Sequence, residues 1–222
     1  MPDTHSHTSI AETIHPDDPE LAALSGRTIG HYERVAADFW EGTKDHDVSQ
    51  NRAALLDALP SGQVLDILEF GCGPGRDVAW FASQGHRVVG LDGCASFCRM
   101  AHELTGAEVW RQDFLNLDLP PERFDGVFAN ASLFHIPRAH LTRVLTQLQQ
   151  TLKPGGVLFS SNPRGAEEGW RGERYGTYLE YEPFCEHLRA AGLEPEHHYY
   201  RPPGLPRHEQ PWLAMVSRKG RG

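Results

Sequence analysis

The feature that most limits how this chain can fold is a regular alternation of strand-like and helix-like segments from about Gly62 onward. Short apolar runs, typical of buried strands, are each followed by a segment whose apolar residues have helical spacing. Such alternation predicts a parallel sheet with helices on both faces, because each connection between parallel strands crosses over the sheet. The expected strands are residues 63–70, 86–92, 107–113, 124–131 and 155–161, and the expected helices are residues 76–85, 94–106, 137–152 and 179–192.

The two ends of the chain depart from this alternation. Residues 193–201 and 211–219 both resemble strands, and the Pro-rich loop between them is too short for a helical crossover. An antiparallel hairpin is therefore expected at that edge of the sheet. Residues 1–25 are polar and are expected to be disordered or loosely ordered. Residues 26–61 are expected to form a helical cap and residues 62–222 the core of one single domain.

A glycine-rich turn, LEFGCGPGRD, follows the first expected strand. Gly71, Gly73 and Gly75 let the backbone turn tightly and approach a ligand at the N-terminus of the next helix, although a purely structural turn would also explain them. The spacing is G-x-G-x-G and not the G-x-G-x-x-G of dinucleotide sites, which disfavours a nicotinamide oxidoreductase. Glu69 precedes the first glycine, where an acid would repel pyrophosphate but suits a cationic amino group.

Acidic residues also end the second and third expected strands. Asp92 lies 17 residues past Gly75, where a carboxylate can accept hydrogen bonds from both hydroxyls of a ribose. Asp113, with Phe114 beside it, offers a partner for an adenine amino group and a stacking face. Because ligands of such sheets bind beyond the carboxyl ends of the strands, these residues predict one nucleoside-like site.

The combined pattern resembles the class I methyltransferases that use S-adenosylmethionine. The resemblance rests on E-x-G-x-G-x-G, an acid after strand two, QDF after strand three and LKPGG before strand five, and it covers about residues 30–218. It implies a Rossmann-like α/β fold with seven strands, mostly parallel, and S-adenosylhomocysteine as the product of the cofactor. The implied cofactor-binding residues are Tyr32, Glu69, Gly71, Cys72, Gly73, Asp92, Gly93, Asp113, Phe114 and Asn130, with Tyr32 at the methionine carboxylate and Asn130 near the sulfonium.

Composition excludes several other classes. Hydrophobic residues make up 39% of the chain and charged residues 23%, which is typical of a globular protein. The net charge of −9 argues against a nucleic-acid partner. No apolar run reaches the 18 residues of a membrane span, no signal peptide is evident, and the four cysteines lack metal-ligand spacing. A cytoplasmic protein with no metal site and no membrane partner is expected.

The acceptor pocket should be built by the segments that surround the sulfonium. These segments are rich in polar and aromatic side chains, and the candidate substrate contacts are Phe39, His46, Asp47, Asn51, Arg164, Trp170, Tyr175 and Arg201. The arginines are candidate clamps for a carboxylate, with a surface ion pair as the alternative. His135 is a candidate catalytic residue together with Asn130, or else a hydrogen-bonded loop histidine. Asp47 or Ser49 could instead only cap the helix that follows.

The amino-acid sequences of these segments resemble one family more specifically. GTKDHDVSQN, EVWRQDFL, FDGVFANASLFHIP, SNPRG…EGW…RYG and HYYRPPGLPR…QPWLA together are similar to the methyltransferase module of ovothiol synthase, which methylates the π nitrogen of 5-thiohistidine. The resemblance implies that product, ovothiol A, and a functional link to a separate sulfoxide synthase. The rivals are a methyltransferase of the same fold for another small acceptor, and a non-catalytic subunit that binds the cofactor.

Overall fold

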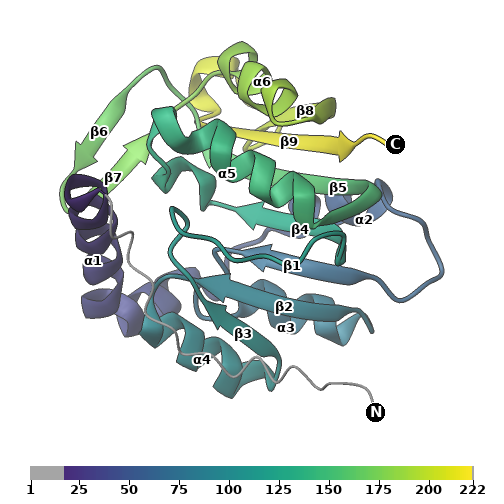
Figure 1. The fold of residues 1–222 in the computed structure, drawn as a ribbon, viewed down its shortest axis with the longest axis horizontal. Helices are drawn as coiled ribbons and strands as arrows, with labels where there is room; N and C mark the ends of the chain where they lie inside the picture. Colours follow the sequence, from purple (N-terminus) through teal and green to yellow (C-terminus); the bar gives the residue numbers. More distant parts are fainter. Residues whose placement is uncertain (1–17, 222) are drawn as a thin grey trace.

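The computed structural model describes residues 18–221 as one seven-stranded sheet flanked by helices, with a separate two-stranded hairpin (Figure 1). The strand order is β3-β2-β1-β4-β5-β9-β8, with β1 to β5 parallel and the last two strands antiparallel. The strands are β1 (Asp66–Phe70), β2 (Arg87–Asp92), β3 (Glu108–Arg111), β4 (Phe124–Asn130), β5 (Leu152–Pro163), β6 (Glu168–Arg171), β7 (Arg174–Thr177), β8 (Leu193–Arg201) and β9 (Trp212–Lys219). The helices are α1 (Pro19–Thr43), α2 (Ser49–Asp57), α3 (Arg76–Ser83), α4 (Ala95–Thr105), α5 (Arg138–Thr151) and α6 (Tyr181–Ala190), with short 3-10 turns at Leu133–His135 and Arg207–Glu209. The predicted fold class is confirmed, including the antiparallel pair at the C-terminal edge.

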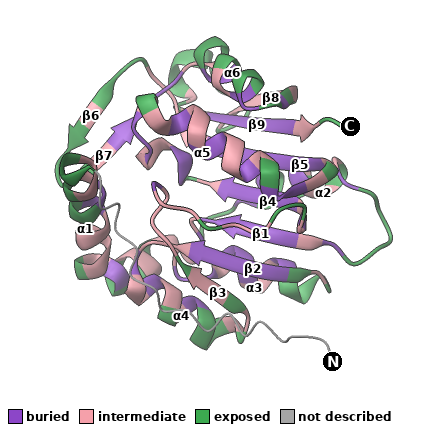
Figure 2. Cartoon of the chain, in the orientation of Figure 1, coloured by how far each residue is buried: buried purple, intermediate pink, exposed green. Residues whose placement is uncertain are grey.

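Two apolar layers hold the helices against the sheet. Side chains of α5 and α6, such as Leu145 and Leu188, pack on one face with Leu68. Side chains of α2, α3 and α4 pack on the other face with Ile67. Adjacent residues of β1 therefore serve opposite layers, as the alternation of side chains along a strand requires. Figure 2 shows the central strands buried along most of their length, so the remaining open surface of the sheet is at the strand ends.

The helical cap starts earlier than the sequence pattern suggested. Asp18 is the N-cap of α1, with its carboxylate accepting from the backbone N–H groups of Glu20 and Leu21, and Pro19 is the first helical residue. Residues 19–25 are therefore helical, which corrects the expected loose segment at that end, and residues 1–17 lie outside the described residues. Figure 1 shows α1 lying across the end of the sheet at which the parallel strands finish.

The hairpin of β6 and β7 was not among the strands expected from the sequence. Trp170 pairs with Tyr175 in this hairpin, and Gly172 occupies the turn with a φ of 64°. The hairpin packs against α1, so both elements cover the same end of the sheet (Figure 1). None of the described helices is long and apolar enough to cross a membrane.

Gly75 joins the glycine-rich turn to α3 and tolerates no side chain. Its φ is 95°, and an added Cβ would lie 2.8 Å from the Cα and 2.9 Å from the Cβ of Ala101 on α4. We expect Gly75→Ala to lower the free energy of unfolding by at least about 2 kcal/mol, because backbone strain and overpacking add. Gly85→Ala is the matched control, since Gly85 has a φ of 86° but open space around it. Urea unfolding measures both, and equal losses would show that packing against α4 is unimportant.

Candidate functional site

A cavity of about 700 Å³ lies at the carboxyl ends of the parallel strands. Its walls come from α1, from the turns after β1, β2, β3 and β4, and from the end of β8. All of the expected cofactor-binding residues line it, namely Tyr32, Glu69, Gly71, Cys72, Gly73, Asp92, Gly93, Asp113, Phe114 and Asn130. His135 lines it as well. The described residues contain no cluster of His, Cys, Asp or Glu that could hold a metal ion.

Asp92 is fixed at the end of β2 by the backbone around it. Its two carboxylate oxygens accept from the N–H of Gly73 at 3.0 Å and from the N–H of Cys94 at 2.9 Å. Burial raises the pKa of Asp92 to about 6, although the backbone hydrogen bonds oppose that shift. Each carboxylate oxygen keeps lone-pair capacity beyond these bonds, so the group can accept further hydrogen bonds from hydroxyls in the cavity.

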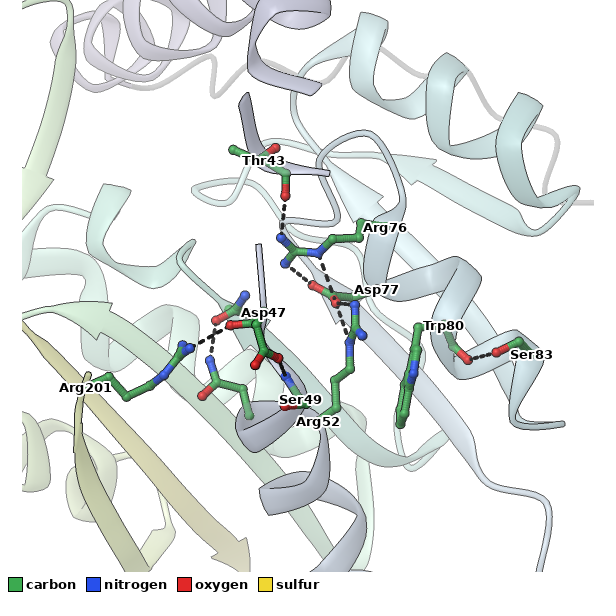
Figure 3. A network of polar contacts seen from close by, with 11 residues as sticks. Thr43, Asp47, Ser49, Arg52, Arg76, Asp77, Trp80, Ser83 and Arg201 are labelled. Atoms are coloured by element: carbon green, nitrogen blue, oxygen red, sulfur yellow. Dashed lines mark hydrogen bonds and ion pairs between the residues drawn. The ribbon is translucent and has the colours of Figure 1, made fainter. Parts of the chain in front are cut away.

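Glu69 is a buried acid with an unsatisfied oxygen. Only 3% of the residue is exposed, and its Oε2 has no hydrogen-bond partner in the described part of the chain. Burial, and then the charge of Asp77, raise the pKa of Glu69 well above its ordinary value. The nearby Arg52 and Arg76 are both bonded to Asp77 (Figure 3), and their charges oppose this rise in pKa without reversing it. A buried carboxylate in this condition suits a cationic group brought by a ligand.

Helix α1 closes the side of the cavity near β3. The hydroxyl of Ser25 donates to Oδ2 of Asp113 at 2.6 Å, and the N–H of Leu115 donates to Oδ1 at 2.9 Å. Phe114 packs on Phe70 with ring centroids 4.3 Å apart. These contacts place a carboxylate and an aromatic ring beside each other where the sequence predicted an adenine site.

Tyr32 and His135 form a hydrogen-bonded pair inside the cavity. Nδ1 of His135 lies 2.7 Å from the carbonyl oxygen of Tyr175, and Nε2 lies 2.9 Å from the hydroxyl of Tyr32. Because a carbonyl only accepts, Nδ1 carries the hydrogen and Nε2 accepts from the Tyr32 hydroxyl. Burial lowers the pKa of His135 to about 4. Both ring nitrogens are occupied and the ring is neutral near pH 7, so His135 acts on the cavity by holding Tyr32.

Asn130 is oriented by a second polar chain. Asn51 is fully buried and donates from Nδ2 to Oδ1 of Asn130 at 2.9 Å, while the hydroxyl of Tyr199 donates to Oδ1 of Asn51 at 2.9 Å. The amide oxygen of Asn130 is therefore already engaged, and its NH₂ group remains as a donor toward the cavity. Asn51, an expected substrate contact, lies behind Asn130 and does not line the cavity.

The remaining expected substrate residues divide into two groups. Phe39, His46, Asp47 and Arg201 line the cavity. The side chains of Arg164, Trp170 and Tyr175 do not, which corrects the sequence expectation for their placement.

Each of these three side chains has a partner elsewhere. Arg164 binds both oxygens of Glu180 at 2.9 Å and the backbone carbonyls of Gln210 and Arg207. Arg27 lies over the Trp170 ring, and the Tyr175 hydroxyl donates to Glu168.

The loop that precedes α2 has more than one role. Val48 is the N-cap of this helix, not Asp47 or Ser49 as the sequence suggested. The Asp47 carboxylate nevertheless accepts from the Ser49 N–H at 2.9 Å, and this bond lowers the pKa of Asp47. Asp47 also lines the cavity, so turn formation and contact with a ligand are compatible in one residue.

Sequence reasoning missed several lining residues. Arg174 at the start of β7 faces the cavity and interacts with the Tyr32 hydroxyl. Ser25, Thr28 and Ile29 on α1 were also missed, although they lie on the same helix as the expected Tyr32 and Phe39, and Phe97, Phe134 and Trp212 complete the aromatic wall. The helical spacing of the α1 residues was visible in the sequence and could have identified this face.

Comparison with known proteins shows which proteins this chain resembles. Residues 67–156 match a family model described as a methyltransferase domain. Residues 67–156 are thus similar to a methyltransferase domain. The chain is similar to the crystal structure of the Burkholderia thailandensis 1,6-didemethyltoxoflavin-N1-methyltransferase with bound S-adenosylhomocysteine. That similarity has a TM-score of 0.66 at 25% identity and covers 91% of each chain.

Curated relatives of the chain are methyltransferases named for different acceptors. The chain is 35% identical over 123 residues to the trans-aconitate 2-methyltransferase of Azoarcus sp. (strain BH72), covering 54% of this chain and 48% of the relative. It is 29% identical over 145 residues to the malonyl-[acyl-carrier protein] O-methyltransferase of Enterobacter lignolyticus (strain SCF1), covering 64% of this chain and 53% of the relative. The chain thus spans about half the length of these relatives.

The cavity fits S-adenosylmethionine on an observation independent of these comparisons. The unpaired Oε2 of Glu69 is the kind of group that the cationic amino end of the cofactor satisfies. Asp92 has acceptor capacity for hydroxyls, and the pair of Asp113 and Phe114 offers a carboxylate and a ring face. We infer these residue roles from the geometry and the sequence pattern.

The tautomer of His135 in the methyltransferase domain can be tested directly. We expect the imidazole to stay neutral, with hydrogen on Nδ1, from pH 5 to 8, because burial lowers its pKa to about 4. Nitrogen-15 NMR of labelled histidines distinguishes the two tautomers and the protonated ring. His135→Asn serves to assign the signal. A titration midpoint between pH 6 and 7 would contradict a buried ring that has a hydrogen bond at each nitrogen.

Proposed function

We propose that the protein transfers a methyl group from S-adenosylmethionine to a small-molecule acceptor bound in the same cavity. One observation carries this proposal. The cavity has three acids suited to the cofactor at the ends of β1, β2 and β3, and polar and aromatic side chains beyond β4 where an acceptor would bind. Its volume of about 700 Å³ lies within the ordinary range for small-molecule sites.

The chain's own residues would act mainly by positioning. S-adenosylmethionine supplies an electrophilic methyl group, and the acceptor must approach it in line with water excluded. Held geometry of this kind can correspond to effective molarities of about 10⁵–10⁸ M. Asn130 would orient a polar atom near the reacting centre through its NH₂ group, and Phe39 and Trp212 would exclude water. Since His135 is neutral with both nitrogens engaged, the proposal assigns it no proton transfer.

Release of S-adenosylhomocysteine from a panel of small acceptors tests this function. The panel contains trans-aconitate, malonate, histidine and 5-thiohistidine, each incubated with protein and S-adenosylmethionine. Acceptor-dependent release supports methyl transfer. Tight cofactor binding without any turnover would favour the rival, a non-catalytic cofactor-binding subunit. Calorimetry with NAD against S-adenosylhomocysteine separates the oxidoreductase alternative.

5-Thiohistidine is the narrower acceptor hypothesis. It rests on the resemblance of five segments to the methyltransferase module of ovothiol synthase, and the comparisons give it no support. The relatives act on trans-aconitate, malonyl-[acyl-carrier protein] and 1,6-didemethyltoxoflavin. We therefore place the broader class first and keep N-methylation of 5-thiohistidine, with a separate sulfoxide synthase upstream, as a specific hypothesis. Absence of turnover with 5-thiohistidine beside turnover of another acceptor would eliminate it. A cytoplasmic location, consistent with four free cysteines, belongs to the same proposal.

A further inference from the structure

We propose that Arg201 binds a carboxylate of the acceptor, so that the substrates of this site are small organic acids or amino acids. The inference rests on the proposed function and narrows its substrate class. Arg201 is the last residue of β8 and lines the cavity. In the sheet order, β8 lies at the opposite edge from β3, whose end carries the adenine candidates Asp113 and Phe114. Arg201 therefore belongs to the acceptor side.

The hydrogen bonds of Arg201 leave its guanidinium without a bonded carboxylate among the described residues, although the Asp47 carboxylate lies near enough that, after the larger effect of the Ser49 N–H, the charge of Arg201 helps to lower its pKa. Its Nη2 donates to the backbone carbonyl of Asp47 at 2.9 Å (Figure 3). Its Nε is buried and has no acceptor among residues 18–221. No Asp or Glu within residues 18–221 forms an ion pair with it.

Other arginines near the cavity are differently engaged. Arg52 and Arg76 both pair with the buried Asp77, and Arg164 pairs with Glu180. A buried N–H donor without an acceptor costs free energy, and a guanidinium is best satisfied by a planar carboxylate that accepts two parallel hydrogen bonds. Because one bond to Asp47 already fixes the guanidinium, little side-chain entropy remains to be lost when such a ligand binds.

The surroundings of Arg201 connect it to the candidate reaction centre. Tyr199 lies two residues earlier on β8, so its side chain is on the same face of the strand. Its hydroxyl donates to Asn51, which in turn donates to Asn130. Tyr199, Asn51 and Asn130 thus form a polar chain that starts on the same strand face as Arg201, and a carboxylate on Arg201 would position the rest of a small acceptor toward Asn130. Asp47 lies at the same wall and would favour an ammonium group next to that carboxylate.

Arg174 provides the contrast that makes the proposal testable. It also lacks an ion pair in the described part of the chain, but it interacts with Tyr32, the residue expected at the methionine carboxylate. Loss of Arg174 should therefore weaken cofactor binding, whereas loss of Arg201 should weaken acceptor binding. In this assignment Arg174 serves the methionine carboxylate of the cofactor, and Arg201 serves the carboxylate of the acceptor.

The experiment compares Arg201→Gln, Arg174→Gln and the control Arg207→Gln, whose side chain stacks on Tyr200 outside the cavity. Acceptors are offered as acid and primary amide pairs, such as histidine with histidinamide and phenylacetate with phenylacetamide, together with trans-aconitate. We expect wild type to prefer the acids and Arg201→Gln to raise their KM by about 10- to 100-fold. The Kd of S-adenosylhomocysteine, measured by calorimetry, should be unchanged in Arg201→Gln and in Arg207→Gln.

Each outcome has a distinct meaning. Equal turnover of acids and amides by wild type would overturn the carboxylate assignment while leaving methyl transfer intact. A weaker Kd for S-adenosylhomocysteine in Arg201→Gln, with acceptor KM unchanged, would assign Arg201 to the cofactor and also overturn it. No turnover of any acceptor by wild type would instead count against the proposed function itself. Arg201→Lys should restore part of the acid preference, because it keeps the charge but not the two-pronged geometry.

Discussion

Glu69→Gln is expected to weaken S-adenosylhomocysteine binding on the order of 100-fold, because an ammonium loses its charged partner. The same change should stabilise the ligand-free protein. Glu69 is buried, its Oε2 is unsatisfied, and its pKa is raised well above the ordinary value of 4.5. A carboxyl with a raised folded-state pKa contributes stability below its unfolded pKa, and that contribution is lost as the pH rises toward the folded value. A glutamine at this position does not ionise, so the variant does not lose this stability as the pH rises.

Urea unfolding at pH 5 and pH 8 measures this difference. Near pH 5 wild type and Glu69→Gln should be close, and at pH 8 the variant should be more stable by about 1–3 kcal/mol. Glu167→Gln is the control, since Glu167 is exposed and pairs only with Arg171. A variant that binds S-adenosylhomocysteine like wild type would remove Glu69 from the cofactor site. A variant less stable than wild type at pH 8 would contradict the unpaired buried charge.

The cofactor side of the cavity was predictable because topology alone brings its residues together. Glu69 and Asp92 lie at the carboxyl ends of two strands of a parallel sheet and Asp113 follows a third, so any sheet with those strands adjacent places all three carboxylates at one edge. That inference needs the order of the strands but no detail of side-chain packing. The start of α1 was equally available in the sequence, since Asp18 followed by Pro19 is a strong N-cap signal.

The acceptor side depends on details that the sequence does not display. On β7, Arg174 faces the cavity while Tyr175 turns away to Glu168, because successive side chains on a strand point to opposite sides. Because the hairpin was not recognised in the sequence, Tyr175 was expected to contact the substrate and its neighbour Arg174 was overlooked. Arg164 is held by backbone carbonyls of Gln210 and Arg207, more than 40 residues later in the chain. No local pattern could reveal that these carbonyls and Glu180 would occupy its guanidinium.

Asp92→Asn is expected to weaken S-adenosylhomocysteine binding by at least about 100-fold, because two hydroxyl hydrogen bonds to one carboxylate are worth several kcal/mol. The amide keeps one acceptor oxygen, but its NH₂ group must face the backbone N–H of either Gly73 or Cys94. Both groups are donors, so one hydrogen bond of the wild type is lost. Asp66→Asn is the matched control at the opposite end of β1. Asp66 pairs with Arg87 and Lys153, which hold its pKa down at about 2, so that variant should lose stability at neutral pH but keep its affinity.

The pH dependence of binding separates a role of Asp92 in binding from a role in folding. Burial raises the pKa of Asp92 to about 6, so its contribution to the stability of the ligand-free protein is present below the ordinary value of 3.8 and lost as the pH rises through 6. Hydroxyls of the ligand favour the ionised form, so affinity should change in the opposite direction. We expect the Kd of S-adenosylhomocysteine to rise by up to about tenfold per unit as the pH falls below 6. In Asp92→Asn the inflection near pH 6 should vanish. A wild-type Kd that stays constant from pH 5 to 7.5 would show that this carboxylate does not bind the cofactor.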